Sequence, residues 1–372
     1  MKKISFLCFL FFMIYNVYSQ SFYLFAGTYT NKGSKGIYIY QFNANTGAAK
    51  LISNTDSVAN PSYLAISPDG KFVYSVNETG GNRPGFVSAF SFDNASGKLK
   101  FINSQPSGGD HPCYITIDKT NSWVVVGNYT GGNIAALPVN KDGSLKPYAQ
   151  LIQHKGSGTN KARQEKAHVH ATVFSPDQRW LFTPDLGMDA LMIYPFTPSA
   201  SQPFSEKKSA AVKVLPGNGP RHFVFHPSKK FAYLIEELSG SVAAYGYSNG
   251  KLKFLQRFAT HPSNYKGAIG SADIHLSPDG KFLYASNRGD ANTITIFSVA
   301  QDGKLQWKGY QSTGGIHPRN FMIDPTGNWL LVANRDTDNI VIFKRNKQTG
   351  ILAASGNEIK LSSPVFLKMI KF

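Results

Sequence analysis

A short turn motif, clearest at residues 277–284 (SPDGKFLY), occurs in six copies along the chain of 372 residues. The copies begin about fifty residues apart, at Ser67, Asp118, Ser175, His226, Ser277 and Asp324. Pro and Gly around an Asp favour a tight turn, because proline fixes φ and glycine accepts positive φ. The aromatic and β-branched run after each turn predicts a strand that is buried on both faces.

Each copy continues into further strand-like runs, and no helical periodicity separates one copy from the next. A repeat of this length with several strands is typical of a β-propeller. Residues 22–30 and 36–42 predict a strand pair without such a turn, and residues 364–371 predict a last strand. We therefore expect an all-β fold, a seven-bladed β-propeller of four-stranded antiparallel blades whose ring is closed by the N- and C-terminal strands.

Residues 1–19 resemble a secretory signal peptide, with Lys2 and Lys3 before an apolar run and a cleavage point after Ser19. A retained membrane anchor is the alternative. We expect export to the periplasm or the extracellular space, with residues 20–372 as one propeller domain and no stable membrane insertion after cleavage. Cys113 is then the only cysteine left, so no internal disulfide can form and we predict a small buried residue there.

The formal net charge is +17, and the basic residues are scattered singly rather than gathered in runs. This distribution disfavours a nucleic-acid partner and fits the attraction of small anions.

Alignment of the six turns identifies two positions at which the residue type differs from copy to copy and is often charged. The position eleven residues after the first turn residue holds Glu78, Tyr129, Leu186, Glu237, Arg288 and Arg335. The position five residues before each turn holds Ser62, Cys113, His170, Arg221, Ala272 and Arg319. Strands joined by a tight turn are antiparallel, so both positions lie at the blade end away from the turn. Around a propeller channel we therefore expect one face to gather His170, Arg221, Glu237, Arg288 and Arg319, with Glu78 and Arg335 as neighbours.

Two interpretations of this cluster are open. Arg–Glu pairs can brace the channel, or the side chains can form a pocket for an anionic, oxygen-rich small molecule, since guanidinium groups suit carboxylate and phosphate. A histidine and a glutamate add acid–base capacity. His168 and His170 alternate along the chain, as do Asp273 and His275, which is compatible with metal ligation. Because nearby arginines oppose a cation, we predict no metal and no cofactor.

Four segments carry a family resemblance: residues 170–177, 219–238 (GPRHFVFHPSKKFAYLIEEL), 272–288 (ADIHLSPDGKFLYASNR) and 317–334. Together they resemble the seven-bladed propeller lactonase family, which includes propeller-type bacterial 6-phosphogluconolactonases and fungal carboxymuconate cyclases. The resemblance extends over essentially the whole chain after residue 19. It implies that the catalytic residues are His170, Arg221, Glu237 and Arg288. To these we add as candidate substrate-binding residues Arg319, Arg335, Glu78 and His222.

The resemblance and the aligned positions together favour a 6-phosphogluconolactonase-like hydrolase that opens a sugar-type lactone ester. In this hypothesis Glu237 or His170 accepts a proton from the attacking water, and Arg221 and Arg288 stabilise the oxyanion. The chain has no Gly-x-Ser-x-Gly elbow and no glycine-rich phosphate loop, which disfavours serine hydrolases and nucleotide enzymes. The alternatives are a non-catalytic exported propeller that binds a small anion or a protein, and a carboxymuconate cyclase-type isomerase.

Overall fold

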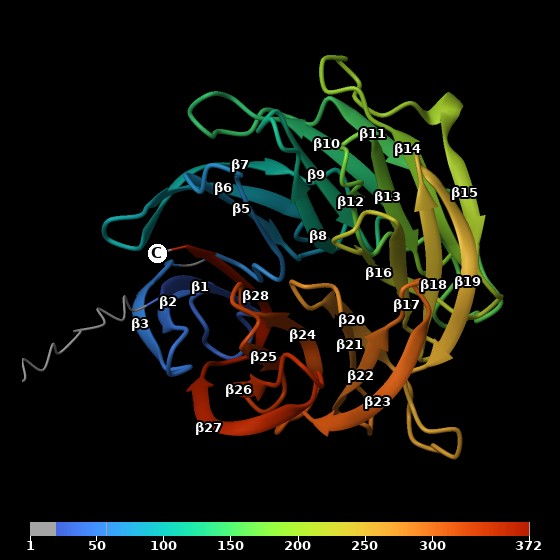
Figure 1. Ribbon diagram of the computed structural model, residues 1–372. Helices are drawn as coiled ribbons and strands as arrows, with labels where there is room; N and C mark the ends of the chain where they lie inside the picture. The colour runs from blue at the N-terminus through green and yellow to red at the C-terminus, as the bar shows by residue number, and fades with distance from the viewer. Residues whose placement is uncertain (1–19, 57, 372) are drawn as a thin grey trace, which may run out of the picture.

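The computed structural model describes residues 20–56 and 58–371, and it places them in seven four-stranded antiparallel sheets. The sheets follow one another around a ring in chain order, from blue to red in Figure 1. The predicted fold, a seven-bladed β-propeller, is therefore confirmed.

Each blade has four strands, which are named below from the innermost strand, at the channel, to the outermost. The first blade combines the last strand of the chain, β28 (Pro364–Lys371), with β1 (Ser21–Thr28), β2 (Ile37–Asn43) and β3 (Ala49–Asn54). The next three blades are β4 (Leu64–Ile66), β5 (Phe72–Asn77), β6 (Phe86–Asp93) and β7 (Lys98–Pro106); β8 (Pro112–Ile117), β9 (Trp123–Asn128), β10 (Asn133–Pro138) and β11 (Gln150–Gln153); and β12 (Val173–Phe174), β13 (Trp180–Asp185), β14 (Ala190–Pro195) and β15 (Ala210–Lys213). The last three are β16 (Pro220–Phe225), β17 (Phe231–Glu236), β18 (Ser241–Ser248) and β19 (Lys251–Ala259); β20 (Ser271–Leu276), β21 (Phe282–Asn287), β22 (Thr293–Val299) and β23 (Leu305–Ser312); and β24 (Pro318–Ile323), β25 (Trp329–Asn334), β26 (Asn339–Arg345) and β27 (Leu352–Lys360). A 3-10 turn, η1, spans Glu206–Lys208 before β15.

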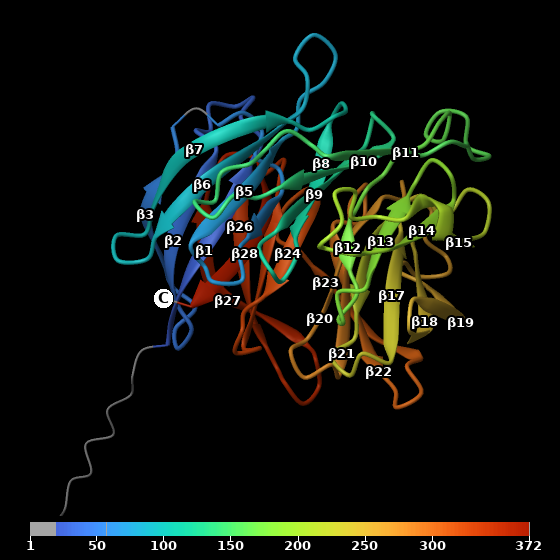
Figure 2. The same cartoon turned by 90° about the horizontal axis from the view of Figure 1, so that it is seen from above.

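The ring is closed by strand β28, which pairs antiparallel with β1. Both Figure 1 and Figure 2 show these two strands, from opposite ends of the chain, side by side. Leu24 lies opposite Met369, and both side chains belong to an apolar core that also includes Leu331 from the neighbouring last blade. The predicted shared blade is therefore present, and closure leaves the inner edge of β1 paired.

The repeated turns have one backbone geometry, whatever residue occupies them. The fourth residue of each turn has positive φ in all six copies: Gly70, Asn121, Gln178, Lys229, Gly280 and Gly327. Glycine is the residue that adopts this conformation without steric cost. The strand after each turn packs between two blades, and β9, β21 and β25 are buried at every residue, as the sequence predicts.

The predicted signal peptide, residues 1–19, lies outside the described residues. Within residues 20–56 and 58–371, no helix is long and apolar enough to cross a membrane. Cys113 is buried as predicted, and its burial raises the pKa of the thiol to about 12.

Candidate active site

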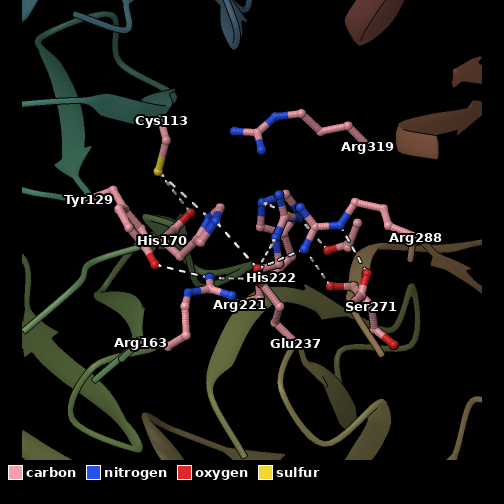
Figure 3. Close-up of polar contacts among 12 residues, drawn as sticks. Cys113, Tyr129, Arg163, His170, Arg221, His222, Glu237, Ser271, Arg288 and Arg319 are labelled. Carbon is pink, nitrogen blue, oxygen red and sulfur yellow. Dashed lines mark hydrogen bonds and ion pairs between the residues drawn. The ribbon is translucent and has the colours of Figure 1, made fainter. Parts of the chain in front are cut away.

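Four of the residues at the two aligned positions meet at one end of the channel, away from the repeated turns. Strand pairing explains this: Pro220 of β16 lies opposite Glu236 of β17, so Arg221 and Glu237 follow as near neighbours. Arg288 comes directly after β21, and His170 lies just before β12. The predicted convergence of these four side chains is visible in Figure 3.

The carboxylate of Glu237 is the centre of the cluster. Its Oε2 accepts a hydrogen bond from Nε of Arg221 at 2.9 Å and pairs with Nη2 of Arg288 at 3.0 Å. Nε2 of His170 lies 3.9 Å from the same oxygen. Glu237 and Arg221 expose only 4% and 1% of their surface, so these charges interact with little screening by water.

A third arginine, Arg163, was not predicted. Its Nη2 donates to Oε1 of Glu237 at 2.7 Å and lies 3.3 Å from the hydroxyl of Tyr129. Arg163 lies in the connection between β11 and β12, outside both the repeated turns and the aligned positions. Nothing in the repeat pattern marks it, because no other blade has an equivalent loop. Tyr129 does occupy an aligned position, but as a neutral residue it gave no signal of a charged contact.

Arg319 and Glu78 form a second pair at the same end of the channel. Nη2 of Arg319 lies 3.5 Å from Oε2 of Glu78, and the guanidinium lies over the ring of Tyr29. The hydroxyl of Tyr29 donates to Glu78 at 3.0 Å. Figure 3 shows the guanidinium of Arg319 extending toward the space above His222 without a bond to Glu237. Tyr29 was missed because the first blade lacks the turn on which the alignment rests.

His222 follows Arg221 in β16, and its ring contacts the Arg221 guanidinium. Its Nδ1 donates to Oδ1 of Asp273 at 2.7 Å, and Nη1 of Arg221 donates to its Nε2 at 3.2 Å. These bonds require a neutral imidazole with the proton on Nδ1. Asp273 also bonds Nε2 of His275 at 2.9 Å and the amide of Asn320. His222 therefore holds the Arg221 guanidinium in place beside the cluster, and its role in substrate binding stays a prediction.

Arg335 is turned away from the other arginines. Its Nε and Nη2 donate to the carboxylate of the next residue, Asp336, at 2.6 Å and 3.1 Å. The backbone of Arg335 lies at the position that the alignment predicts, but its side chain binds the adjacent carboxylate instead of pointing to the cluster.

The two candidate metal-ligand pairs have protein partners instead. The ring nitrogens of His168 bond Glu165 at 3.1 Å and the carbonyl of Tyr129 at 3.0 Å, whereas Asp273 accepts from His222 and His275. Over residues 20–56 and 58–371, no group of three or more His, Cys, Asp or Glu is arranged to hold a metal ion.

Burial and the charges of the arginines together set the protonation states of the cluster. Burial alone would raise the pKa of Glu237, but Arg288 and Arg221 outweigh it and hold this pKa well below its usual range. Burial, aided by Arg221, lowers the pKa of His170 well below that of a free histidine. Burial and Arg288 lower the pKa of Arg221 only to about 10. At neutral pH the cluster therefore holds an ionised carboxylate, protonated arginines and a neutral imidazole.

Stability is expected to fall between pH 7 and pH 5. Burial lowers the pKa of His222 to about 4, so below pH 6.5 the unfolded chain binds a proton that the folded chain refuses. His222 alone should cost about 2 kcal/mol of unfolding free energy over this range. Glu237 contributes nothing here, because its stabilising effect is lost only below about pH 4.5. Urea unfolding at several pH values measures how the unfolding free energy changes with pH. If His222→Asn shows the same change between pH 7 and pH 5, His222 is not its source.

Comparison with known proteins places this chain in a family. Residues 23–369 match the model of the family described as "Lactonase, 7-bladed beta-propeller". The chain therefore belongs to the seven-bladed β-propeller lactonase family, and the predicted class, a lactone hydrolase, is confirmed.

Three relatives span almost the whole chain. The 6-phosphogluconolactonase of Formosa agariphila is 43% identical over 94% of this chain and 99% of its own length. The 6-phosphogluconolactonase of Bacillus subtilis is 34% identical over 93% of this chain and 97% of its own. The solved structure of the periplasmic gluconolactonase of Pseudomonas aeruginosa superimposes with a TM-score of 0.90 at 36% identity, over 94% of this chain and 99% of that one.

Proposed function

We propose that this protein hydrolyses the lactone of a sugar acid, with a preference for a phosphorylated lactone such as 6-phosphogluconolactone. One observation carries the preference: four guanidinium groups at the channel end, from Arg163, Arg221, Arg288 and Arg319, face only two carboxylates. Two positive charges are uncompensated among these side chains, and a phosphate dianion supplies the complementary charge. The relatives named 6-phosphogluconolactonase support the same substrate.

In the mechanism that we infer, His170 is the base. Glu237 is bonded to three arginines, so its carboxylate is a weak proton acceptor and acts instead as their anchor. The neutral imidazole of His170 accepts a proton from water as the water oxygen attacks the lactone carbonyl. Arg221 and Arg288 donate to the oxyanion that forms. The ring C–O bond then breaks, the ring oxygen takes the proton from His170, and a ring-opened acid leaves.

The substrate's own charge assists this base. The arginines that bind the phosphate also depress the pKa of His170, so neutralising them raises that pKa toward the working pH. An anionic lactone thus makes His170 a better base than an uncharged lactone does.

Acid release by the purified protein tests the proposal, with glucono-1,5-lactone and its 6-phospho form compared above their spontaneous rates. We expect kcat/KM to be at least about tenfold higher for the phosphorylated lactone, since one charged contact is worth about that factor. Equal values for the two lactones would refute the preference for phosphate. No acceleration of either would refute sugar-lactone hydrolysis.

Removal of one uncompensated positive charge should weaken binding of the phosphorylated lactone more than binding of glucono-1,5-lactone. Arg319 has a single long ion pair, to Glu78 at 3.5 Å, and is therefore available to bind the phosphate. We expect Arg319→Met to raise KM about tenfold for the phosphorylated lactone and far less for glucono-1,5-lactone. Arg335→Met is the matched control, because Asp336 already engages that side chain. An equal effect of Arg319→Met on both lactones would contradict this role.

We also propose that the protein is exported, on the basis of residues 1–19 and of the relative from Pseudomonas aeruginosa that is named periplasmic. Mass spectrometry of protein from the cell envelope or culture medium should find a mature chain that begins at Gln20. Recovery of intact Met1 in the cytoplasmic fraction alone would contradict export.

A further inference from the structure

The channel has a second cavity, at the end opposite the arginine cluster. Its volume is about 220 Å³, and its lining includes Ile66, Ile117 and His275. These residues come just before the repeated turns at Ser67, Asp118 and Ser277, so the cavity opens on the turn face of the ring.

Aromatic rings separate this turn-side cavity from the candidate active site. Tyr63 and Tyr114 stack at 4.0 Å, and the ring of His222 meets Tyr114 edge-on at 5.4 Å. Tyr63 and Asn320 line the turn-side cavity on one side and, on the other, a small space beside Arg221 and Arg319. A ligand in the turn-side cavity is therefore held apart from Glu237 and His170.

Lys368 contributes the only full positive charge among the lining residues of this cavity. It projects from the inner strand β28, and within the part of the chain that the structure describes its amine has neither an ion pair nor a hydrogen bond. Lys368 is exposed to solvent, and no carboxylate lies among the residues that line the cavity. An ammonium group in such a position is stabilised by an anion that enters the cavity.

The rest of the lining indicates the kind of anion. Ile66, Ile117 and Tyr114 supply apolar walls, and His275 supplies an imidazole whose Nε2 is already bonded to Asp273. One amine beside apolar walls suits a single negative charge attached to an apolar body. A phosphate dianion requires more donors than this cavity offers.

We propose that the turn-side cavity binds a small organic carboxylate, with the carboxylate on Lys368 and the apolar part against Ile66 and Ile117. This site is distinct from the lactone site and needs no assumption about the lactone.

Calorimetric titration of the full chain with benzoate and propionate tests the proposal. We expect saturable binding that weakens at least about tenfold in Lys368→Met, a loss typical of a hydrogen bond to a charged group. Lys371→Met is the matched control, because Lys371 is another exposed lysine of the same strand but does not line the cavity. Lactone hydrolysis should continue in Lys368→Met, which verifies its fold. Unchanged affinity in Lys368→Met would overturn the proposal and place the anion at the arginine cluster.

Reductive methylation of the unmutated protein locates the site independently. Saturating benzoate should slow methylation of Lys368 several-fold and leave Lys371 unaffected, as read by peptide mass spectrometry. No protection of Lys368 would overturn the site. Protection by inorganic phosphate as strong as that by benzoate would overturn its assignment to organic carboxylates.

Discussion

Replacement of His170 by Asn is expected to slow lactone hydrolysis by about 10²–10⁴-fold, the usual contribution of a general base. The imidazole is neutral at pH 7 and lies 3.9 Å from Glu237, within a cluster of arginines able to hold the carbonyl and its developing charge. The measurement is kcat/KM for acid release per folded molecule. The pH profile of kcat should also lose its acidic limb in the variant.

His168→Asn is the matched control for this experiment. His168 is also buried and only two residues away, but its ring bonds Glu165 and the carbonyl of Tyr129 rather than Glu237. We expect its kcat/KM to stay within a few-fold of the unmutated protein. Similar losses in both variants would mean that the effect comes from local structure, and near-normal hydrolysis in His170→Asn would exclude His170 as the base.

Replacement of Glu237 by Gln should damage both activity and stability. The change leaves Arg163, Arg221 and Arg288 close together without their shared carboxylate, and loss of one partner of a buried ion pair typically costs about 3–5 kcal/mol. Without the anchor the arginines no longer present fixed donors to the oxyanion, so kcat should fall by about 10²–10³-fold. Chemical unfolding and acid release measure the two effects.

The neighbouring residue offers a matched control. Glu236 is equally buried and accepts two hydrogen bonds from Arg257, at 2.8 Å and 2.9 Å, but it lies outside the Glu237 cluster. Glu236→Gln should therefore lower stability while hydrolysis per folded molecule is retained. If Glu236→Gln reduces hydrolysis as severely as Glu237→Gln, general destabilisation explains both and the anchoring role of Glu237 is refuted.

The repeated turn was sufficient to predict the fold, because a turn and the buried strand after it recur with one spacing. The same spacing predicted that Arg221, Glu237 and Arg288 meet, since antiparallel pairing fixes which backbone positions share an end of the blade. Only residues that belong to the repeated turn and its flanking strands can be placed in this way. Arg163 comes from a loop without a counterpart in other blades, so its contact with Glu237 depends on a path that no alignment describes.

The repeat predicts where the backbone of a residue lies, but it does not predict the direction of the side chain. Arg335 occupies the same aligned position as Glu237 and Arg288, yet it bends to Asp336 beside it. A local carboxylate competes effectively for a long, flexible arginine near solvent. The sequence NRD at 334–336 contains this competitor, so the pairing could have been anticipated from the adjacent aspartate.

Closure of the ring by β28 has a consequence for the order of biosynthesis. The strand that seals the first blade leaves the ribosome after every other strand of the ring, and it also supplies Phe366, Leu367 and Lys368 to the wall of the channel. The amide of Leu367 donates to Asn320 of the last blade, so β28 joins the two blades that are farthest apart in translation. A prematurely terminated chain thus has an open ring, an unpaired β1 edge prone to aggregation, and an incomplete channel. Only a chain that has been translated through β28 can assemble the closed ring.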